Sequence, residues 1–345
     1  ASDLHMVAGQ QPILRIRGDM ERVKFRAMGD DELKAMLYEI CPEEKIKLFE
    51  ETGDIDFGYE IPGLARYRCN FFRQKYGIGS VFREIPSKIM SCEDLGLPKV
   101  VSRLAQLPKG LVLVTGPTGS GKSTTLAAII DEANRTRKDH ILTVEDPIEF
   151  VHQSQKCIVN HREVGTHTRS FSAALRGALR EDPDIIMVGE MRDLETISLA
   201  MEAAMTGHLV FGTLHTLNAM KTVDRVIEIF PANQQGQVRS TLADALKAVV
   251  SQTLFKRIDI KGRCAALEIL IATPAVRNLI RDGKTFQIAS VMQTGRKYGM
   301  QTLDDAIETY LEKRMISPES AYSNAMDKAK FLKFLSKPPA DFTEV

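Results

Sequence analysis

The sequence predicts an α/β protein, with a twisted, mostly parallel sheet in its larger C-terminal part and a smaller α+β domain before it. Three observations predict this class. From Leu111 onward, apolar segments of strand length alternate with segments of helical spacing. A glycine-rich phosphate-binding motif joins the first of these strands to the first helix. The length of 345 residues also exceeds what one hydrophobic core usually serves, so two domains are expected.

The N-terminal part is expected to be small and mixed. Residues 12–26 alternate weakly around Gly18 and Asp19, which predicts a hairpin. Helical and strand patterns follow, with helices expected at 31–40 and 43–51 and strands at 55–59 and 65–72. Proline and glycine then interrupt the pattern at Pro86, Gly96 and Pro98. We therefore place an N-terminal domain at residues 1–88, a linker at 89–98 and a second domain at 99–345.

The second domain is expected to hold one parallel sheet with helices on its faces. Four apolar segments predict its buried strands: Leu111–Thr115, Ile141–Glu145, Ile185–Gly189 and Leu209–Leu214. Helical spacing predicts the connecting helices 124–137, 171–181 and 194–205, the last one ending at Gly207. Further helices are expected at 218–229, 235–255, 275–281, 303–313 and 318–329. A helical segment of about 273–345 therefore ends the chain.

Residues 116–123 have the sequence Gly-Pro-Thr-Gly-Ser-Gly-Lys-Ser, which is a complete P-loop pattern. The backbone N–H groups of such a loop face a phosphate chain at a helix N-terminus. Lys122 would neutralise the β- and γ-phosphates, and Ser123 would place its hydroxyl on Mg²⁺. The alternative is a glycine-rich turn that binds nothing. The residues expected to bind nucleotide are Gly116, Thr118, Gly119, Ser120, Gly121, Lys122, Ser123 and Thr124.

Two groups of carboxylates follow predicted strands. Glu190 comes directly after the strand 185–189. We expect this strand to lie beside the one that enters the phosphate loop, so that Glu190 reaches Mg²⁺ and the γ-phosphate. Residues 145–149 read Glu-Asp-Pro-Ile-Glu, and charge repulsion makes such a cluster costly unless a cation or a proton relieves it. An exposed strand end and a solvated acidic turn are the respective alternatives.

Two histidines bracket the strand 209–214. His215, at its carboxyl end, is the better placed to sense a γ-phosphate, while His208 lies at the other end. A structural role remains the alternative for each. The other histidines of this part are expected at the surface, namely His140, His152, His161 and His167.

Composition excludes several classes of protein. The net charge is +1, with 15 Lys and Arg against 17 Asp and Glu in residues 1–100, so no basic stripe marks a nucleic-acid motor. No apolar run approaches a membrane span, and no secretory signal is evident, which favours a cytosolic location. The five cysteines include no C-x-x-C pair, so we expect no zinc site and reduced, partly buried thiols.

Four of these segments, in this order and spacing, resemble the secretion and type IV pilus ATPase superfamily. Its Walker A, Asp, Walker B and His boxes would be residues 116–123, 145–149, 184–190 and 206–215. Within that family the chain resembles the pilus retraction ATPases at residues 158–164, 178–197 and 206–216. The helix 275–282, Ala-Val-Arg-Asn-Leu-Ile-Arg-Asp, resembles their AIRNLIRE motif with two conservative changes. Residues 165–170 depart from the family pattern, in what we expect to be a surface loop.

The resemblance implies a fold and a mechanism. It implies a hexameric ring whose subunits have a PAS-like N-terminal domain and a RecA-like C-terminal domain with ATP between them. It implies that Glu149 is the general base and that Glu190 is the Walker B glutamate on the Mg²⁺ side. Arginines of the N-terminal domain would close on the phosphates, and the candidates are Arg66, Arg68 and Arg83. Ion pairs within that domain are the alternative for each arginine.

The resemblance also implies partners and a location. Homohexamer subunits, an inner-membrane pilus platform protein and a paralogous retraction ATPase are the expected partners, and nucleic acid is not. The expected location is the cytoplasm, at the inner face of the inner membrane. A pilus-assembly or type II secretion ATPase, a RecA-type nucleic-acid motor and an accessory ring subunit are the alternatives. Assembly and secretion ATPases usually carry an extra N-terminal domain and a four-cysteine zinc insertion, and this sequence has neither.

Overall fold

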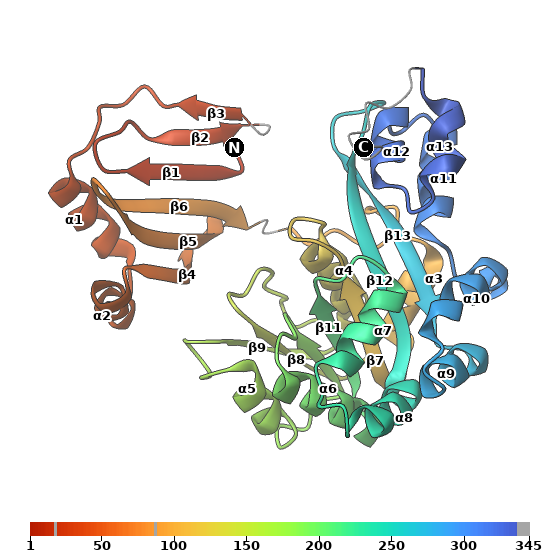
Figure 1. Cartoon of the computed structure of the whole chain (residues 1–345). Helices are drawn as coiled ribbons and strands as arrows, with labels where there is room; N and C mark the ends of the chain where they lie inside the picture. The colour runs from red at the N-terminus through yellow and green to blue at the C-terminus, as the bar shows by residue number, and fades with distance from the viewer. Residues whose placement is uncertain (17–18, 86–87, 337–345) are drawn as a thin grey trace. The chain divides into compact units, whose positions relative to one another are not determined.

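The structure is a computed structural model and describes residues 1–16, 19–85 and 88–336 (Figure 1). Gly18 of the expected hairpin, Pro86 before the expected linker and residues 337–345 of the expected helical segment lie outside these ranges. The chain divides into two compact units. Unit 1 comprises residues 1–89 and 147–151, and unit 2 comprises residues 90–146 together with the chain from 152 onward.

Unit 1 is built on one antiparallel sheet of six strands in the order β3-β2-β1-β6-β5-β4 (Figure 1). The strands are β1 Asp3–Val7, β2 Ile13–Ile16, β3 Asp19–Arg22, β4 Asp54–Ile61, β5 Ala65–Gln74 and β6 Gly77–Ile85. The expected hairpin is confirmed, because β2 pairs with β3 and Ile16 lies opposite Asp19. The strands β1 and β6 were not expected from the sequence.

Two helices complete unit 1, α1 Asp30–Ile40 and α2 Glu43–Thr52, both close to their expected bounds. Their apolar stripes supply Leu33, Leu37 and Phe49 to a core with the buried side chains of β4 and β5. Phe71 lies at the centre of this core, with its ring edge-on to that of Phe57 at a centroid distance of 5.1 Å. Alternation along β5 thus turns Cys69 and Phe71 inward.

Unit 2 is built on a sheet of seven strands in the order β13-β12-β7-β11-β10-β8-β9. All neighbours are parallel except β12 and β13, which form a long antiparallel hairpin. The strands are β7 Gly110–Thr115, β8 His140–Glu145, β9 Ile158–Glu163, β10 Ile185–Val188, β11 Leu209–Leu214, β12 Leu246–Lys256 and β13 Arg263–Ile271. The four expected strands are confirmed, whereas β9, β12 and β13 were not expected.

One expectation about strand order is wrong. The strand that carries Glu190 does not lie beside the strand that enters the phosphate loop, because β11 pairs with both and separates them. Parallel strands place their carboxyl ends on the same edge of a sheet. The inserted strand therefore brings His215 between the phosphate loop and Glu190.

Helices cover both faces of this sheet (Figure 1). They are α3 Lys99–Arg103, α4 Lys122–Thr136, α5 Phe171–Ala178, α6 Leu194–Thr206, α7 Ala219–Glu228, α8 Gln235–Ala245, α9 Pro274–Arg281, α10 Ile288–Thr294, α11 Leu303–Glu312, α12 Pro318–Asn324 and α13 Lys328–Phe331. Side-chain caps fix several starts, since Ser170, Asp193 and Asn218 each accept a hydrogen bond from the first turn of α5, α6 and α7.

Three helix expectations need correction. The expected helix 235–255 ends at Ala245, and the chain continues as β12. The reason is that Val249 and Val250 are fully buried against β7, and this pairing outweighs the weak helical spacing. The expected helix 318–329 breaks into α12 and α13, and the expected helix 171–181 ends at Ala178.

All five cysteines are free and buried, as the composition predicts. Burial raises the pKa of Cys41 and of Cys92 to about 11 and that of Cys69 to about 12. These thiols therefore stay protonated at neutral pH. In the described part of the chain, no helix combines the length and the apolar character that crossing a bilayer requires.

Candidate nucleotide-binding site

The phosphate loop leaves β7, whose six residues are all buried, and leads into α4. Three glycines of the loop have positive φ angles, 143° at Gly116, 78° at Gly119 and 89° at Gly121. Only glycine adopts such angles without strain, so the spacing of glycines matches the path of the backbone. Gly121 is the N-cap of α4, and the positive end of the helix therefore faces the loop.

Lys122 folds back over the loop from the first position of α4. Its Nζ donates to the carbonyl oxygens of Gly116 at 2.8 Å and Pro117 at 3.0 Å. These contacts place the ammonium group across the loop, where a phosphate oxygen could replace a carbonyl as the acceptor. Ser123 and Thr124 follow in the first turn of α4, and Thr118 is exposed at the tip of the loop. The predicted set of loop residues thus lies together.

Glu190 and His215 meet at the carboxyl ends of neighbouring strands. His215 Nε2 lies 2.7 Å from Glu190 Oε1, and Arg192 Nε lies 2.5 Å from the same oxygen. Burial acts to raise the pKa of Glu190, but the hydrogen bonds and charges of Arg192 and His215 together hold it below its usual value. Glu190 is therefore ionised at neutral pH. The hydroxyl of Thr213 donates to the Gly189 carbonyl and ties β11 to the end of β10.

A chain of hydroxyls, buried except for the half-buried Thr216, connects the loop to the segment after His215. Thr115, the last residue of β7, lies 2.7 Å from Ser251 of β12 and 3.4 Å from Thr222 of α7, oxygen to oxygen. Thr222 in turn lies 2.7 Å from Thr216. Hydrogen bonds therefore link Thr216, the residue after His215, to Thr115 at the start of the phosphate loop.

The acidic segment 145–149 follows β8 directly. Glu145 is buried and belongs to unit 2, whereas Glu149 is half-buried and lies in the stretch 147–151 that belongs to unit 1. Glu145 Oε1 lies 3.8 Å from His161 Nδ1 on the neighbouring strand β9. The segment thus joins the two units in sequence, at the position where the family resemblance expects the general base.

Two histidines were expected at the surface and are not there. His152 is buried, and its ring stacks on that of His161 at a centroid distance of 5.9 Å. The backbone N–H of His152 donates to His161 Nε2, so the Nδ1 of His161 carries the proton and donates to the Thr143 hydroxyl. Burial, with a smaller contribution from His161, lowers the pKa of His152 to about 4. His152 therefore packs as a neutral ring at neutral pH.

The three candidate arginines of unit 1 each have a carboxylate partner within that unit. Arg83 pairs with Asp3 at 2.8 Å, Arg68 with Asp56 at 3.3 Å, and Arg66 with Glu60 at 3.7 Å. Ion pairs within the N-terminal domain were the alternative expected for these arginines, and the structure contains one for each of them. Of the three, only the Arg68–Asp56 pair is exposed on both sides, and such a pair contributes about 0–1 kcal/mol, so a phosphate could replace Asp56 at low cost.

The residues of the site fit a magnesium nucleotide. In the ranges that the structure describes, no three acidic, histidine or cysteine side chains form a metal cluster. Mg²⁺ beside a nucleotide does not need one, because it takes one or two protein oxygens with phosphates and waters. The Ser123 hydroxyl and the ionised Glu190 supply hard oxygen donors of that kind. A Cβ at Gly116 would lie 2.4 Å from the Gln252 carbonyl oxygen, so the loop has the close packing that only glycine allows.

Several residues of this site were missed by the sequence analysis. Arg192, Gln252 and Ser251 are polar residues without a recognised motif around them. Arg192 follows Glu190 by two residues, and that spacing could have indicated a pair. Gln252 and Ser251 gave no usable signal, because their segment was expected to be helical.

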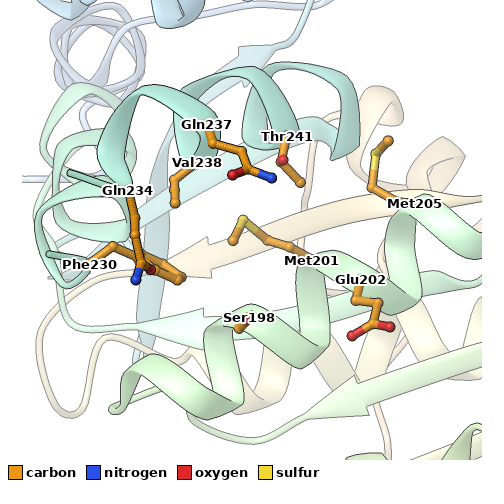
Figure 2. Close-up of a pocket in the computed structure, with 9 residues that line it drawn as sticks. All are labelled: Ser198, Met201, Glu202, Met205, Phe230, Gln234, Gln237, Val238 and Thr241. Carbon is orange, nitrogen blue, oxygen red and sulfur yellow. The ribbon is translucent and has the colours of Figure 1, made fainter. Parts of the chain in front are cut away.

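Two cavities of unit 2 lie away from the phosphate loop. Figure 2 shows one of about 370 Å³, lined by α6, α8 and the segment before α8, and another of about 480 Å³ lies beside the start of α9. None of the residues that line either cavity belongs to the four boxes. A phosphate chain is held by an open loop of backbone N–H groups, so we place the site at the loop.

The chain is similar to known proteins over nearly its whole length. Residues 88–276 match the family model described as Type II/IV secretion system protein. The chain is 56% identical over 330 residues to the "Type IV pilus retractation ATPase PilT" of Pseudomonas aeruginosa, covering 96% of this chain and 94% of that one. It is 52% identical to the "Twitching motility protein" of Neisseria gonorrhoeae over 316 residues, 92% of this chain and 84% of that one.

A solved structure has the same architecture as this chain. The crystal structure of the pilus retraction motor PilT with bound ADP superposes with a TM-score of 0.88 at 45% identity, covering 96% of this chain and 94% of that one. The similarity extends over both units, so the fold class expected from the sequence is confirmed.

Proposed function

The chain belongs to the Type II/IV secretion system protein family, and from that premise we propose that it is the ATPase motor that powers type IV pilus retraction. It hydrolyses ATP to ADP and phosphate. The released free energy drives pilus depolymerisation and thereby twitching motility. Support for retraction, rather than pilus assembly or secretion, comes from a similarity to retraction proteins that spans both units.

One observation carries the proposal. The phosphate loop, the ionised Glu190 and His215 converge at the carboxyl ends of β7, β10 and β11, where open parallel sheets bind their ligands. A loop alone binds a phosphate chain. A loop beside an ionised carboxylate, which is itself held by an imidazole, can also respond to the loss of the terminal phosphate.

Each residue has a proposed role in hydrolysis. Lys122 and the N–H groups of the loop stabilise the charge that develops on the phosphates. Glu149 accepts the proton of the attacking water. Glu190 and Ser123 would hold Mg²⁺, which supplies electrostatic stabilisation of the leaving phosphate when bound. His215 orients Glu190 and registers the state of the γ-phosphate.

The coupling to movement is proposed to lie in the N-terminal domain. We place that domain at residues 1–88, the linker at 89–98 and the ATPase domain at 99–345. The N-terminal domain would close as a rigid body over the nucleotide and bring Arg66, Arg68 or Arg83 to the phosphates. Support comes from Arg68, whose ion pair with Asp56 is exposed on both sides and therefore exchangeable.

We further propose a homohexameric ring in the cytoplasm, docked at the inner face of the inner membrane. Successive closures around the ring would turn a membrane-embedded platform protein, and a paralogous retraction ATPase could share the work.

The helix α9, which carries the AIRNLIRE-like sequence, is proposed to act in retraction rather than in hydrolysis. Its buried stripe is Val276 and Ile280, and Arg281 on its outer side pairs with Asp244 at 2.8 Å.

A complementation experiment tests the function. The gene is deleted from its source strain, and twitching and surface pili are scored with and without the gene restored. Retraction predicts lost twitching with excess pili, both reversed by the gene. Loss of pili altogether would instead indicate an assembly ATPase, and unchanged twitching with normal pili would indicate an accessory subunit.

The role of Glu149 is tested by Glu149→Ala. Turnover should fall by on the order of 10²–10⁴, because general-base catalysis contributes about that much. Binding of a fluorescent ADP analogue should stay largely unchanged, since Glu149 is not in the phosphate loop. Lys122→Ala serves as the comparison and should weaken both binding and turnover. Near-normal turnover of Glu149→Ala would rule out Glu149 as the base.

A further inference from the structure

A buried glutamine, Gln252, forms a hydrogen bond with the phosphate loop from the strand β12. Gln252 lies on β12, is only 3% exposed, and uses both ends of its side-chain amide. Its Nε2 donates to the carbonyl oxygen of Ser120 at 2.6 Å, and its Oε1 accepts from the Thr125 hydroxyl at 2.7 Å. A carbonyl can only accept, so the NH₂ group must face Ser120. The amide orientation is thus fixed by its partners.

The first of these bonds orients a peptide group of the loop. The Ser120 carbonyl and the Gly121 N–H belong to one peptide unit, which is planar and trans. In such a unit the C=O and the N–H point in opposite directions. Because Gln252 holds the carbonyl on the β12 side, the Gly121 N–H points away from β12, into the loop. That N–H is one of the donors that a phosphate would use.

The second hydrogen bond connects Gln252 to the helix α4. Thr125 is buried in the first turn of α4, and its hydroxyl keeps Gln252 in register with the start of the helix. One side chain therefore ties the peptide at the end of the loop to the helix N-terminus. Both are parts that a phosphate contacts in sites of this kind.

The glycines of the loop pack closely against this residue. A Cβ at Gly121 would lie 2.8 Å from Gln252 Nε2, and a Cβ at Gly116 would lie 2.4 Å from its backbone oxygen. A Cβ at Gly119 would meet nothing within 4 Å. Two of the three glycines are thus required by the approach of Gln252 as well as by their own φ angles.

We propose that Gln252 is a positioning residue for nucleotide binding, which holds the Gly121 N–H and the start of α4 in the orientation that the phosphates require. The inference rests on the proposed ATPase function and extends it to a strand outside the four boxes. Gln252 itself does not need to touch the nucleotide. Its loss should therefore weaken nucleotide binding and turnover through the loop.

The first test compares Gln252→Met with Gln301→Met in the full chain. Methionine keeps the length of the side chain but removes both hydrogen bonds. Gln301 provides a matched control, because its Nε2 donates to the Leu267 carbonyl of the same hairpin at 2.7 Å, away from the loop. The dissociation constant of a fluorescent ADP analogue is measured by anisotropy, and the free energy of unfolding by urea titration.

Gln252→Met should bind the analogue about tenfold more weakly, as expected for one buried carbonyl left without its donor. Gln301→Met should keep the wild-type dissociation constant, even if its free energy of unfolding falls by a similar amount. Equal affinity of Gln252→Met and wild type would overturn the inference. So would a parallel loss of affinity in both variants, because that would indicate general destabilisation of the hairpin.

The second test uses Gln252→Glu, whose protonation can be controlled. A protonated carboxyl can donate to the Ser120 carbonyl as the amide does, whereas a carboxylate would repel it. Burial raises the pKa of such a carboxyl, which brings its titration toward neutral pH. The analogue should therefore bind Gln252→Glu at least about tenfold more tightly at pH 6 than at pH 8.5, beyond any change in wild type.

A purely structural role would not produce this rescue at low pH. If Gln252→Glu follows the wild-type pH profile, the inference is wrong. If wild type itself does not bind the analogue, the proposed function fails instead, so the two failures can be told apart.

Discussion

Glu190 is a carboxylate with two partners that come from different elements. Arg192 follows it on the loop after β10, and His215 comes from the end of β11. Only His215 lies at the end of the strand that also adjoins β7, so it is the partner that connects Glu190 to the phosphate loop. The histidine should therefore influence turnover without contributing to the binding of the α- and β-phosphates.

His215→Ala is expected to lower turnover by about 10–100-fold, as loss of a residue that orients a metal ligand typically does. The dissociation constant for a fluorescent ADP analogue should change by less than about threefold, because no loop contact is lost. Steady-state ATPase kinetics and anisotropy measure the two quantities.

His208→Ala is the control at the other end of β11. His208 Nδ1 bonds to the Ala203 carbonyl at 2.9 Å, a local contact at the end of α6. This variant should keep turnover near that of wild type. Equal losses of turnover in both variants would contradict a special role of His215.

His152 gives a prediction about pH. Its pKa is about 4 in the folded chain, against an ordinary value of 6.5. The unfolded chain therefore binds a proton that the folded chain does not between these pH values, and the free energy of unfolding falls as the pH drops through that window. Above about pH 6.5, His152 does not contribute to the pH dependence of the free energy of unfolding.

The variant His152→Phe keeps the stacked ring and removes the titration. Between pH 7.5 and pH 5.5, wild type should lose about 1.4 kcal/mol more unfolding free energy than the variant. Urea unfolding at the two pH values measures this difference. Identical losses in the two proteins would show that His152 titrates normally in the fold.

At the scale of elements, the hairpin β12–β13 decides how much space the phosphate loop has. β12 pairs with β7 and places Ser251 opposite Thr115, so the next residue, Gln252, lies directly behind the loop. The loop glycines therefore differ in their tolerance of a side chain, although one motif requires them all.

Gly116→Ala should destabilise unit 2 by about 2–5 kcal/mol, because overpacking against Gln252 adds to the cost of a positive φ. Gly119→Ala should cost only about 1–2 kcal/mol, because its Cβ would enter open space. Urea unfolding of the two variants measures both values. A larger cost at Gly119 than at Gly116 would contradict the close packing of Gly116 against Gln252.

The same hairpin shows why the sequence could not predict every element. The segment 246–256 contains apolar residues at helical spacing, and Gln252 then resembles the polar side of a helix. Its strand conformation depends on pairing with β7 and β13, which are distant in sequence. By contrast, β7, β8, β10 and β11 are short, continuous apolar runs, and such runs indicate buried parallel strands without knowledge of their partners.

At the scale of the whole molecule, the sequence predicts those parts of the site whose residues lie close together in one segment of the chain. The P-loop and the Glu190 strand end are local patterns, and the structure places them at one sheet edge. Strand order is not local, so the insertion of β11 between β7 and β10 was not foreseen. The contacts of Arg192 and Gln252 depend on that order and on β12, and they became visible only in three dimensions.

The proposed ring gives a prediction for the assembled protein. With a non-hydrolysable ATP analogue, light scattering should give a mass about six times the 38.5 kDa of one chain. The reason is that ATP is proposed to bind where domains meet, so nucleotide should favour assembly. A monomer mass at micromolar concentration, with and without the analogue, would contradict the ring.

The burial of all five thiols has a practical consequence for following such movements. Their raised pKa values and their lack of exposure protect them from maleimide reagents at neutral pH. A single cysteine introduced at an exposed position, such as Tyr76, would then be the only reactive group. With one such cysteine introduced in each unit, a pair of fluorophores could be attached without first removing the native cysteines, and energy transfer between them would report the proposed domain closure.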